Sequence, residues 1–285
     1  MVEEKIRLLD QETIDKIAAG EVVERPASVA KELVENAIDA GATAITVEMK
    51  DGGITLLRVT DNGCGIAHDE IQKAFLRHST SKIQNVSDLD GIKSLGFRGE
   101  ALSSIAAISR VELITKTKDE FTGSSYLIEG GKEIELREIG APEGTTFFVR
   151  QIFYNVPARK KFLKSPMTEG SYVSDLVEKL AISHPDIAFV LISGGSEKFA
   201  TSGNGNLKDV IYQLYGRDIT SELMEVSEET PHFFVHGFIG TPLVNRGNRG
   251  YESLFVDGRY VKSQTLLRAL EYGYESFLMQ HQYQF

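Results

Sequence analysis

Three polar side chains fall close together on the segment Ala27–Ala40, which is expected to form a helix. At about 100° per residue, Glu32, Asn36 and Asp39 lie within an arc of roughly 60°. Glu32 could act there as a general base on a water molecule. Asn36 could supply an oxygen to Mg²⁺, which takes few protein ligands and keeps substrate phosphates and water. Taken alone, the pattern also fits the ordinary solvated face of an amphipathic helix.

The ends and the other faces of this segment indicate how the helix would lie. Pro26 at its start and Gly41 just beyond its end form the asymmetry that helices favour. Lys31 and Glu35 are expected to face water. The residues expected to face the core are Val29, Leu33, Ala37 and Ala40.

A second candidate is the run Val59–Ile66, in which a carboxylate follows a predicted strand and precedes two glycines. Asp61 could accept a hydrogen bond from an exocyclic amine such as that of adenine. Gly63 and Gly65 would let a flat ring approach the backbone closely. The alternative is a turn, because Asp-Asn-Gly is good turn chemistry. An EF-hand is excluded, since no Asp or Asn pattern continues to a Glu at the required distance.

The third candidate is Ser94–Leu102, where glycines three apart run into a predicted helix whose free N–H groups can hold phosphates. Arg98 adds positive charge there. Phe97 and Arg98 stand where a Walker loop requires Lys and Ser or Thr, which excludes a P-loop NTPase. The long polar stretch 77–98 before it is compatible with a mobile lid. In it Thr80 and Lys82 could reach a phosphate, or both could be solvated.

Three further patterns are weaker. Thr145 and Thr146 follow Gly144 at the start of a predicted strand, where β-branched residues need no functional explanation. The run 158–164 concentrates four basic residues, a pattern that is usually a solvated face and less often a phosphate or DNA contact. His232 and His236 flank a strand-like segment without an acidic helper, so a zinc site is excluded.

Composition limits the class of protein. A chain of 285 residues with 41% hydrophobic and 25% charged residues predicts about two folded domains. The net charge of −10 argues against a generic nucleic-acid coat, although a local basic patch is compatible with it. Cys64 is the single cysteine, so an intramolecular disulfide and a multi-cysteine metal site are excluded. A charged N-terminus and the lack of a long apolar run predict a soluble, cytoplasmic protein.

The predicted elements favour an α+β sandwich, because helices come first and strands follow in a block. The predicted helices are Glu12–Ala19, Ala27–Ala40, Asp69–Leu76, Gly99–Ser109, Ser171–Ser183, Leu207–Tyr215 and Ser263–Leu278. The predicted strands are Thr43–Met49, Ile54–Thr60, Arg110–Thr117, Ser124–Glu129, Lys132–Ile139, Thr145–Phe153, Ile187–Ile192, Phe233–Ile239 and Tyr251–Val256. The short link Asp51–Gly53 makes the first two strands an antiparallel hairpin, which argues against a Rossmann fold. The expected domains are 1–203 and 204–285.

Taken in order, these motifs resemble the MutL family of DNA mismatch-repair proteins, within the GHKL superfamily of gyrase, heat-shock chaperone, histidine kinase and MutL. They are KELVENAIDAGA, DNGCGI, TSK…SLGFRGEAL and GTTFFVR…FYNVPARKKFL. The resemblance runs from about Ile6 to Glu275. GFRGEAL and FYNVPARKKFL are specific to MutL-type proteins, whereas DxGxG marks only the superfamily. The resemblance implies a Bergerat-type α/β-sandwich ATPase domain, followed by a small transducer domain of ribosomal-protein-like fold.

Carried over position by position, the resemblance implies a role for each motif. Glu32 would activate water, Asn36 would bind Mg²⁺, and Asp61 would recognise the adenine amine between Gly63 and Gly65. Thr80 and Lys82 would belong to a lid, the segment 96–102 would hold the phosphates, and Thr146 or Thr145 would support the adenine. The remaining ATP-binding residues implied in this way are Asp39, Gly96, Phe97, Arg98, Gly99, Glu100, Ala101 and Leu102.

The resemblance also implies cofactors and partners. ATP with Mg²⁺ would order the lid and the segment QETIDKIAAGEVVERP, and would bring two such domains together as a homodimer that can encircle or grip DNA. The protein would act in the bacterial cytoplasm as a matchmaker between the mismatch sensor MutS and a downstream repair endonuclease or helicase. Candidate DNA-contacting residues are Arg159, Lys160, Lys161, Lys164, Arg259, Lys262 and Arg268.

In one place the sequence departs from the family pattern. Family members continue past a helix like Ser263–Leu278 into a DVNVHPxK-type segment, whose lysine reaches the terminal phosphate, whereas this chain ends at Phe285. We therefore expect a truncated fragment that turns ATP over weakly and has no nuclease activity. A non-catalytic docking module for DNA and partner proteins, with a vestigial nucleotide site, is the alternative. A topoisomerase subunit or sensor kinase fits less well, because FYNVPARKKFL matches neither.

Overall fold

The computed structural model describes residues 10–79, 99–279 and 282–285. The chain divides into two compact units, each described below by itself. The first comprises Met1–Val177 and Val190–Lys198, and the second comprises Glu178–Phe189 and Phe199–Phe285. No helix among the described residues is long and apolar enough to cross a lipid bilayer.

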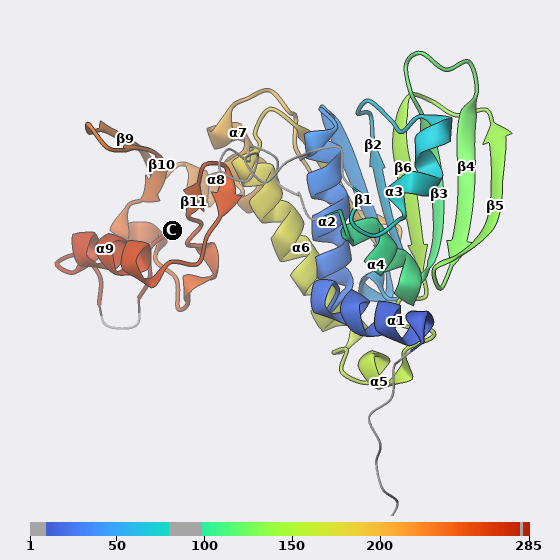
Figure 1. Ribbon diagram of the computed structural model, residues 1–285. Helices are drawn as coiled ribbons and strands as arrows, with labels where there is room; N and C mark the ends of the chain where they lie inside the picture. Colours follow the sequence, from blue (N-terminus) through green and yellow to red (C-terminus); the bar gives the residue numbers. More distant parts are fainter. Residues whose placement is uncertain (1–9, 80–98, 280–281) are drawn as a thin grey trace, which may run out of the picture. The chain divides into compact units, whose positions relative to one another are not determined.

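An eight-stranded sheet, in the order β5-β4-β3-β6-β2-β1-β7-β8, is the framework that carries the candidate residues (Figure 1). The pairs from β1 through β2, β6, β3 and β4 to β5 are all antiparallel. The strands are β1 (Ala44–Lys50), β2 (Leu56–Asp61), β3 (Arg110–Lys116), β4 (Gly123–Glu129), β5 (Lys132–Ile139), β6 (Gly144–Arg150), β7 (Ala188–Ser193) and β8 (Ser196–Ala200). The predicted α+β class and the predicted hairpin are confirmed.

Helices cover one face of this sheet, and α1 packs against α4 (Figure 1). The strands β1, β2, β3 and β6 alternate between buried and partly exposed residues, as expected for a sheet that is covered on one side. The helices of this part are α1 (Gln11–Val22), α2 (Pro26–Asp39), α3 (Ile71–Ala74), α4 (Ala101–Ile108), α5 (Pro157–Lys160) and α6 (Pro166–Ser183). Single 3-10 turns are Asp51–Gly53 and His68–Glu70.

The helix α2 begins and ends as the sequence predicts. Pro26 occupies its first turn, and Gly41, just beyond its end, has a φ of +73°. Its apolar face is wide, because Val29, Ala30 and Val34 are each 0% exposed. Burial of this face against β1 and β2 fixes which side of α2 remains for polar residues.

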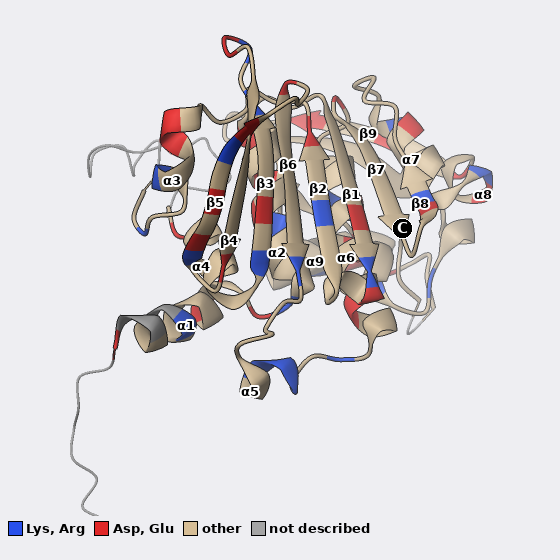
Figure 2. Cartoon of the chain, turned by 90° about the vertical axis from the view of Figure 1, so that its right-hand side faces the viewer, with Lys and Arg blue, Asp and Glu red and all other residues tan. Residues whose placement is uncertain are grey.

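The uncovered face of the sheet carries charges that neutralise one another (Figure 2). Arg58 on β2 pairs with Glu48 on β1 at 2.8 Å, and Arg150 on β6 pairs with Glu112 on β3 at 2.9 Å. The Arg150 guanidinium also lies 4.8 Å from the ring centroid of Phe148. These cross-strand pairs hold the register that sets the positions at the ends of β2, β3 and β6.

The C-terminal end of α4 is unusually well satisfied, because all four of its last carbonyl groups accept hydrogen bonds. Ile105 accepts from Ser109 Oγ at 2.5 Å, and Ala106 accepts from the Gly131 N–H at 2.9 Å. Ala107 accepts from Asn155 Nδ2 at 2.9 Å, and Ile108 accepts from the Phe153 N–H at 2.8 Å. The helix is therefore fixed at this end by the sheet and by the segment that leads into α5.

The second unit has a small core of its own. Ile211, Ile219 and Leu223 are buried, and Leu207, Tyr215, Phe238 and Phe285 pack against them. Its elements are α7 (Leu207–Tyr215), α8 (Arg217–Thr220), β9 (Leu223–Glu229), β10 (Phe234–Gly240), β11 (Phe255–Val256), β12 (Arg259–Tyr260) and α9 (Gln264–Tyr274), with 3-10 turns at Pro242–Val244 and Arg249–Tyr251. The strands β9 and β10 pair antiparallel, as do β11 and β12.

A buried carboxyl group lies within the second unit. The Glu252 side chain is 0% exposed, its two oxygens have no hydrogen-bond partner in the described part of the chain, and Arg249 Nε lies 3.9 Å away. Burial and the negative charge of Glu271 raise the pKa of Glu252 to about 7. The positive charge of Arg249 opposes this shift. Near neutral pH this group therefore exists in both its charged and its neutral form.

Several predicted boundaries are wrong. β8 and β9 were not predicted, because SEKFA shows no apolar alternation, LMEVSEE alternates over only four residues, and most residues of both are exposed. The predicted strand Tyr251–Val256 is reduced to Phe255–Val256, since Tyr251 belongs to a 3-10 turn. The helix expected at Ser171–Ser183 begins earlier, at Pro166, where a proline suits the first turn.

Candidate functional site

Asp61, the last residue of β2, is a buried carboxylate held by backbone groups. It is 8% exposed, and its Oδ1 accepts a hydrogen bond from the Gly63 N–H at 2.8 Å. Burial raises the pKa of Asp61, although hydrogen bonds from the Gly63 and Thr145 backbones favour the charged form. A further donor on the free lone pairs of this carboxylate would stabilise its ionised form.

Asp61 is one of three polar residues in a row across the covered face of the sheet. Asp61 pairs in register with Thr145 on β6, and Thr145 pairs with Thr115 on β3. The Thr115 hydroxyl lies 3.1 Å from the Thr145 hydroxyl, and also 3.1 Å from the Gly144 carbonyl to which it donates. The Ile66 N–H donates to the same Thr115 oxygen at 2.9 Å. This network joins the loop after β2 to the ends of β3 and β6.

Thr115 was missed by sequence reasoning. It is 1% exposed and occupies the same face of β3 as the apolar Val111 and Leu113. A polar residue in the buried register of an alternating strand is the signal that could have identified it. Thr146, in contrast, lies on the opposite face of β6, where its hydroxyl donates to Thr60 at 3.2 Å. Only Thr145 of the two predicted threonines lies beside Asp61.

Two glycines in the loop after β2 are required by the protein's own packing. A Cβ at Gly63 would lie 2.9 Å from Ala40 at the end of α2, and the Cys64 N–H donates to the Ala40 carbonyl at 3.0 Å. Gly65 has a φ of +73°, and a Cβ there would lie 2.2 Å from the Lys116 carbonyl oxygen. The loop is therefore clamped between α2 and the end of β3.

The polar residues of α2 lead toward this loop. Glu32, Asn36 and Asp39 are partly exposed along the helix, and its C-terminal end contacts the loop through Ala40. Glu32 Oε1 lies 3.6 Å from Lys31 Nζ, and the Glu32 side chain is 26% exposed. The Glu32 carboxylate and the Asn36 amide thus lie on one face of α2. The C-terminal end of this helix contacts the loop that follows Asp61.

The predicted orientation of Glu35 is wrong. Glu35 is 8% exposed rather than facing water, and its Oε2 accepts a hydrogen bond from Lys31 Nζ at 2.9 Å. Burial raises the pKa of Glu35, an effect that the hydrogen bond and charge of Lys31 partly offset. The helical-wheel prediction failed here because an i,i+4 partner lets a charged residue be buried.

The third predicted motif is described only in its last part. Thr80, Lys82, Gly96, Phe97 and Arg98 lie outside the described residues. Gly99, with a φ of +63°, packs against the Ser79 backbone, and a Cβ there would lie 2.6 Å from the Ser79 carbonyl oxygen.

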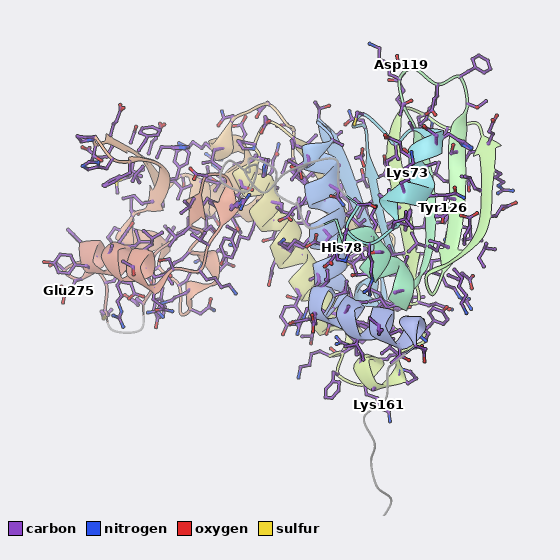
Figure 3. The ribbon with its side chains drawn as sticks, viewed as in Figure 1. Lys73, His78, Asp119, Tyr126, Lys161 and Glu275 are labelled. Atoms are coloured by element: carbon purple, nitrogen blue, oxygen red, sulfur yellow. The ribbon has the colours of Figure 1, made fainter. Side chains whose placement is uncertain are left out.

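Glu100 is the N-cap residue of α4, and its Oε1 lies 3.0 Å from Nδ1 of His78, a residue that is labelled in Figure 3. Ala101 and Leu102 form the first turn of α4 and are partly exposed. The first backbone N–H groups of a helix have no partner within that helix, which is why this turn is a candidate for binding phosphate.

The candidate basic residues lie in different surroundings. Lys160, Lys161 and Lys164 are exposed, and Lys161 lies on the α5 segment (Figure 3). Arg159 on that segment is partly buried and donates to the Gly20 carbonyl at 2.7 Å. Arg259, Lys262 and Arg268 are exposed in the second unit.

Two protein families match separate parts of the chain. Residues 24–135 match the family described as histidine kinase-, DNA gyrase B-, and HSP90-like ATPase. Residues 211–285 match the family described as DNA mismatch repair protein, C-terminal domain. The first match contains α2, the loop after β2 and the start of α4.

Relatives and solved structures agree with these matches. The chain is 66% identical to the DNA mismatch repair protein MutL of Agathobacter rectalis, over 98% of the chain and 43% of that protein. It is 47% identical to MutL of Thermoanaerobacter pseudethanolicus, over 98% of the chain and 45% of that protein. The Aquifex aeolicus MutL ATPase domain complexed with ADP superposes with a TM-score of 0.71 at 28% identity, covering 92% of each chain.

The mainly antiparallel sheet, the family match and the solved relative together define an ATPase domain of the GHKL class. Within that class, the chain belongs to the MutL family of DNA mismatch repair proteins. It spans less than half the length of the curated relatives named above.

The two glycines Gly41 and Gly65 allow a direct test of the loop packing, because both have a φ of +73°. At Gly41 nothing lies within 4 Å of an added Cβ, so Gly41→Ala should cost only the left-handed conformation, roughly 1–2 kcal/mol. At Gly65 the Lys116 carbonyl would also have to move, so Gly65→Ala should cost more. Thermal unfolding measures both, at roughly 2–4 °C per kcal/mol. Equal losses at the two positions would contradict the packing described for Gly65.

Proposed function

We propose that this chain binds and hydrolyses ATP, and that its nucleotide state switches a MutL-type protein between conformations in DNA mismatch repair. The observation that carries the proposal is the buried Asp61 carboxylate, which is anchored by backbone N–H groups beside Thr145 and next to the end of α2. A buried carboxylate needs partners, and two backbone N–H groups leave lone pairs for a ligand. The family match and the ADP complex of the Aquifex aeolicus relative support the same ligand class.

In this proposal the adenine lies at the Asp61 loop. The Asp61 carboxylate accepts the exocyclic amine, and Thr145 lies on the same face of the sheet to support the ring. The glycines at positions 63 and 65 keep the loop backbone close to α2 and to β3. Adenine recognition by a side chain that is itself held by the backbone is preorganised, so little ordering is needed on binding.

The triphosphate then extends along α2 toward its polar face. Glu32 is accessible to solvent and serves as the general base that takes a proton from the attacking water. Asn36 and Asp39 lie on the same face. The N–H groups at the start of α4, in the segment 99–102, contact the phosphates, together with the predicted residues 80, 82 and 96–98 of the preceding segment.

The donor set on α2 fits a magnesium ion held mainly by the substrate. No group of three or more His, Cys, Asp or Glu side chains that could hold a metal occurs among the described residues. Asn36, a partly exposed amide, would hold the ion together with phosphate oxygens and water, which suits magnesium. When bound, Mg²⁺ supplies neutralisation of charge on the phosphates.

The partners follow from the family and stay proposals for this chain. ATP binding would bring two such domains together, and the dimer would link MutS to a downstream endonuclease or helicase on DNA. The exposed Lys160, Lys161 and Lys164 are the DNA-contacting candidates of the first unit, and Arg259, Lys262 and Arg268 are those of the second. The relatives named above are bacterial, so we place this activity in a bacterial cytoplasm.

Replacing Glu32 tests the catalytic assignment. Glu32→Gln should retain ATP binding, because the amide keeps the shape, and should lose about 10²- to 10⁴-fold in single-turnover hydrolysis, because no base remains. Binding is measured by calorimetry and hydrolysis by phosphate release. Glu197→Gln, at an exposed site on β8, is the matched control and should hydrolyse normally. Hydrolysis by Glu32→Gln at the wild-type rate would remove Glu32 from this role.

Replacing Asp61 tests adenine recognition. ITP carries a carbonyl where ATP carries the amine, so the wild-type protein should prefer ATP by about 10- to 100-fold, the worth of a hydrogen bond to a charged group. Asp61→Ala should abolish most of this preference. The ratio of the two affinities is compared, so that a smaller folded fraction affects both nucleotides equally. A preference unchanged in Asp61→Ala would place the amine elsewhere.

DNA contact by the α5 segment is tested by salt dependence. Each phosphate contact releases counterions, so affinity for duplex DNA should fall linearly with salt on a logarithmic plot. The double variant Lys160→Ala/Lys161→Ala should reduce that slope by about 2, because each lysine neutralises one phosphate. A slope identical to that of the wild-type protein would exclude these lysines from the DNA interface.

A further inference from the structure

The C-terminal end of α1 is capped by a side chain from a distant segment. The last carbonyl groups of a helix have no partner within it and favour positive charge. The helix α1 has no basic residue in its last turn, yet its Gly20 carbonyl accepts a hydrogen bond from Arg159 Nη1 at 2.7 Å. The donor comes from α5, 139 residues away in sequence.

The lack of a side chain at Gly20 leaves room for that guanidinium. A glycine inside a helix is destabilising relative to alanine, so its presence in α1 calls for a reason. A Cβ at Gly20 would lie 1.7 Å from the Nη2 atom of Arg159 and 1.8 Å from its Cζ. The guanidinium therefore occupies the space that a side chain at position 20 would need. Gly20 and Arg159 form one contact, and a side chain at position 20 would require the guanidinium to move.

The segment that carries Arg159 is itself fixed to α4. Phe153 and Asn155, just before α5, donate to the carbonyls of Ile108 and Ala107 at the C-terminal end of α4. The helix α1 packs against α4 along its side and lies between α4 and α5 (Figure 1). A closed ring thus runs through α1, α4 and the α5 segment, and the hydrogen bond between Arg159 and Gly20 completes it.

We propose that Arg159 is a positioning residue for nucleotide binding, which holds α1 against α4 through the Gly20 carbonyl. This inference rests on the proposed function, in which the first turn of α4 contacts the phosphates. The helix α4 has eight residues and is about 12 Å long, so a displacement of its packed side is carried to its first turn. Arg159 does not contact a phosphate. It affects nucleotide binding through the positions of α1 and α4.

A stability cycle tests the contact without any nucleotide. In the wild-type background, Gly20→Ala should lower the Tm, because the methyl group displaces the guanidinium. In the Arg159→Ala background, the same change should raise the Tm by roughly 2–4 °C, because alanine is the better helix former and the space is empty. Arg137→Ala, at an exposed site on β5, is the control background, where Gly20→Ala should remain destabilising. If Gly20→Ala changed the Tm in the same direction in all three backgrounds, the proposed contact between Gly20 and Arg159 would be overturned.

Nucleotide affinity tests the positioning role. Arg159→Ala and Gly20→Ala should each weaken magnesium-ATP binding about tenfold and leave adenosine binding unchanged, because the first turn of α4 meets only the phosphates. Arg159→Lys keeps the charge but loses the planar donor, and should bind with intermediate affinity. A purely structural role would weaken both ligands equally or neither, and either result would overturn the proposal.

The same measurements separate this inference from the proposed function. Failure of the wild-type protein to bind either ATP or adenosine would overturn the proposed function itself. Normal ATP binding by the wild-type protein, together with an unchanged ATP affinity in both Arg159→Ala and Gly20→Ala, would overturn only the positioning role of Arg159.

Discussion

The candidate site depends on one buried charge, the carboxylate at the end of β2. Burying such a group is costly unless hydrogen bonds compensate, and Asp61 receives them from the backbones of Gly63 and Thr145. Those bonds require a tight loop after β2 and a β6 strand in register, which in turn require Gly65 and Gly144 to approach neighbouring carbonyls at distances that no side chain tolerates. The end of α2 is brought to the same loop through the Ala40 carbonyl, which accepts a hydrogen bond from the Cys64 N–H.

A second constraint acts at the ends of the helices. Helices leave carbonyl groups without partners, and here the chain satisfies them with segments that are remote in sequence. Beyond its own cap residue Ser109, the end of α4 takes donors from Gly131, Asn155 and Phe153, and α1 takes one from Arg159. The helices α1 and α4 are consequently held at their C-terminal ends.

Much of this arrangement follows from local sequence signals, and the remainder does not. The apolar spacing, Pro26 and Gly41 define α2, and Asp-Gly-Gly defines the first hairpin, because both depend on residues within a few positions of one another. The helix α7 has the predicted bounds Leu207–Tyr215 for the same reason. The partner of Arg159 depends on a contact across the fold, which no local pattern encodes. Arg159 illustrates this point, since a run of basic residues indicates a solvated surface until the helix that it caps is known.

The outer strand of the sheet restricts how copies of this chain can associate. β5 forms one border of the eight-stranded sheet, and such a border presents unpaired N–H and C=O groups to any extended chain that approaches. Lys132, Glu133, Glu135, Arg137 and Glu138 are all exposed along β5, with both signs interspersed (Figure 2). An incoming strand would have to desolvate these charged side chains in order to form backbone hydrogen bonds with β5. Continuous sheet formation between copies is thereby disfavoured at β5, so that a partnership between two such domains has to be built from other surfaces than this border.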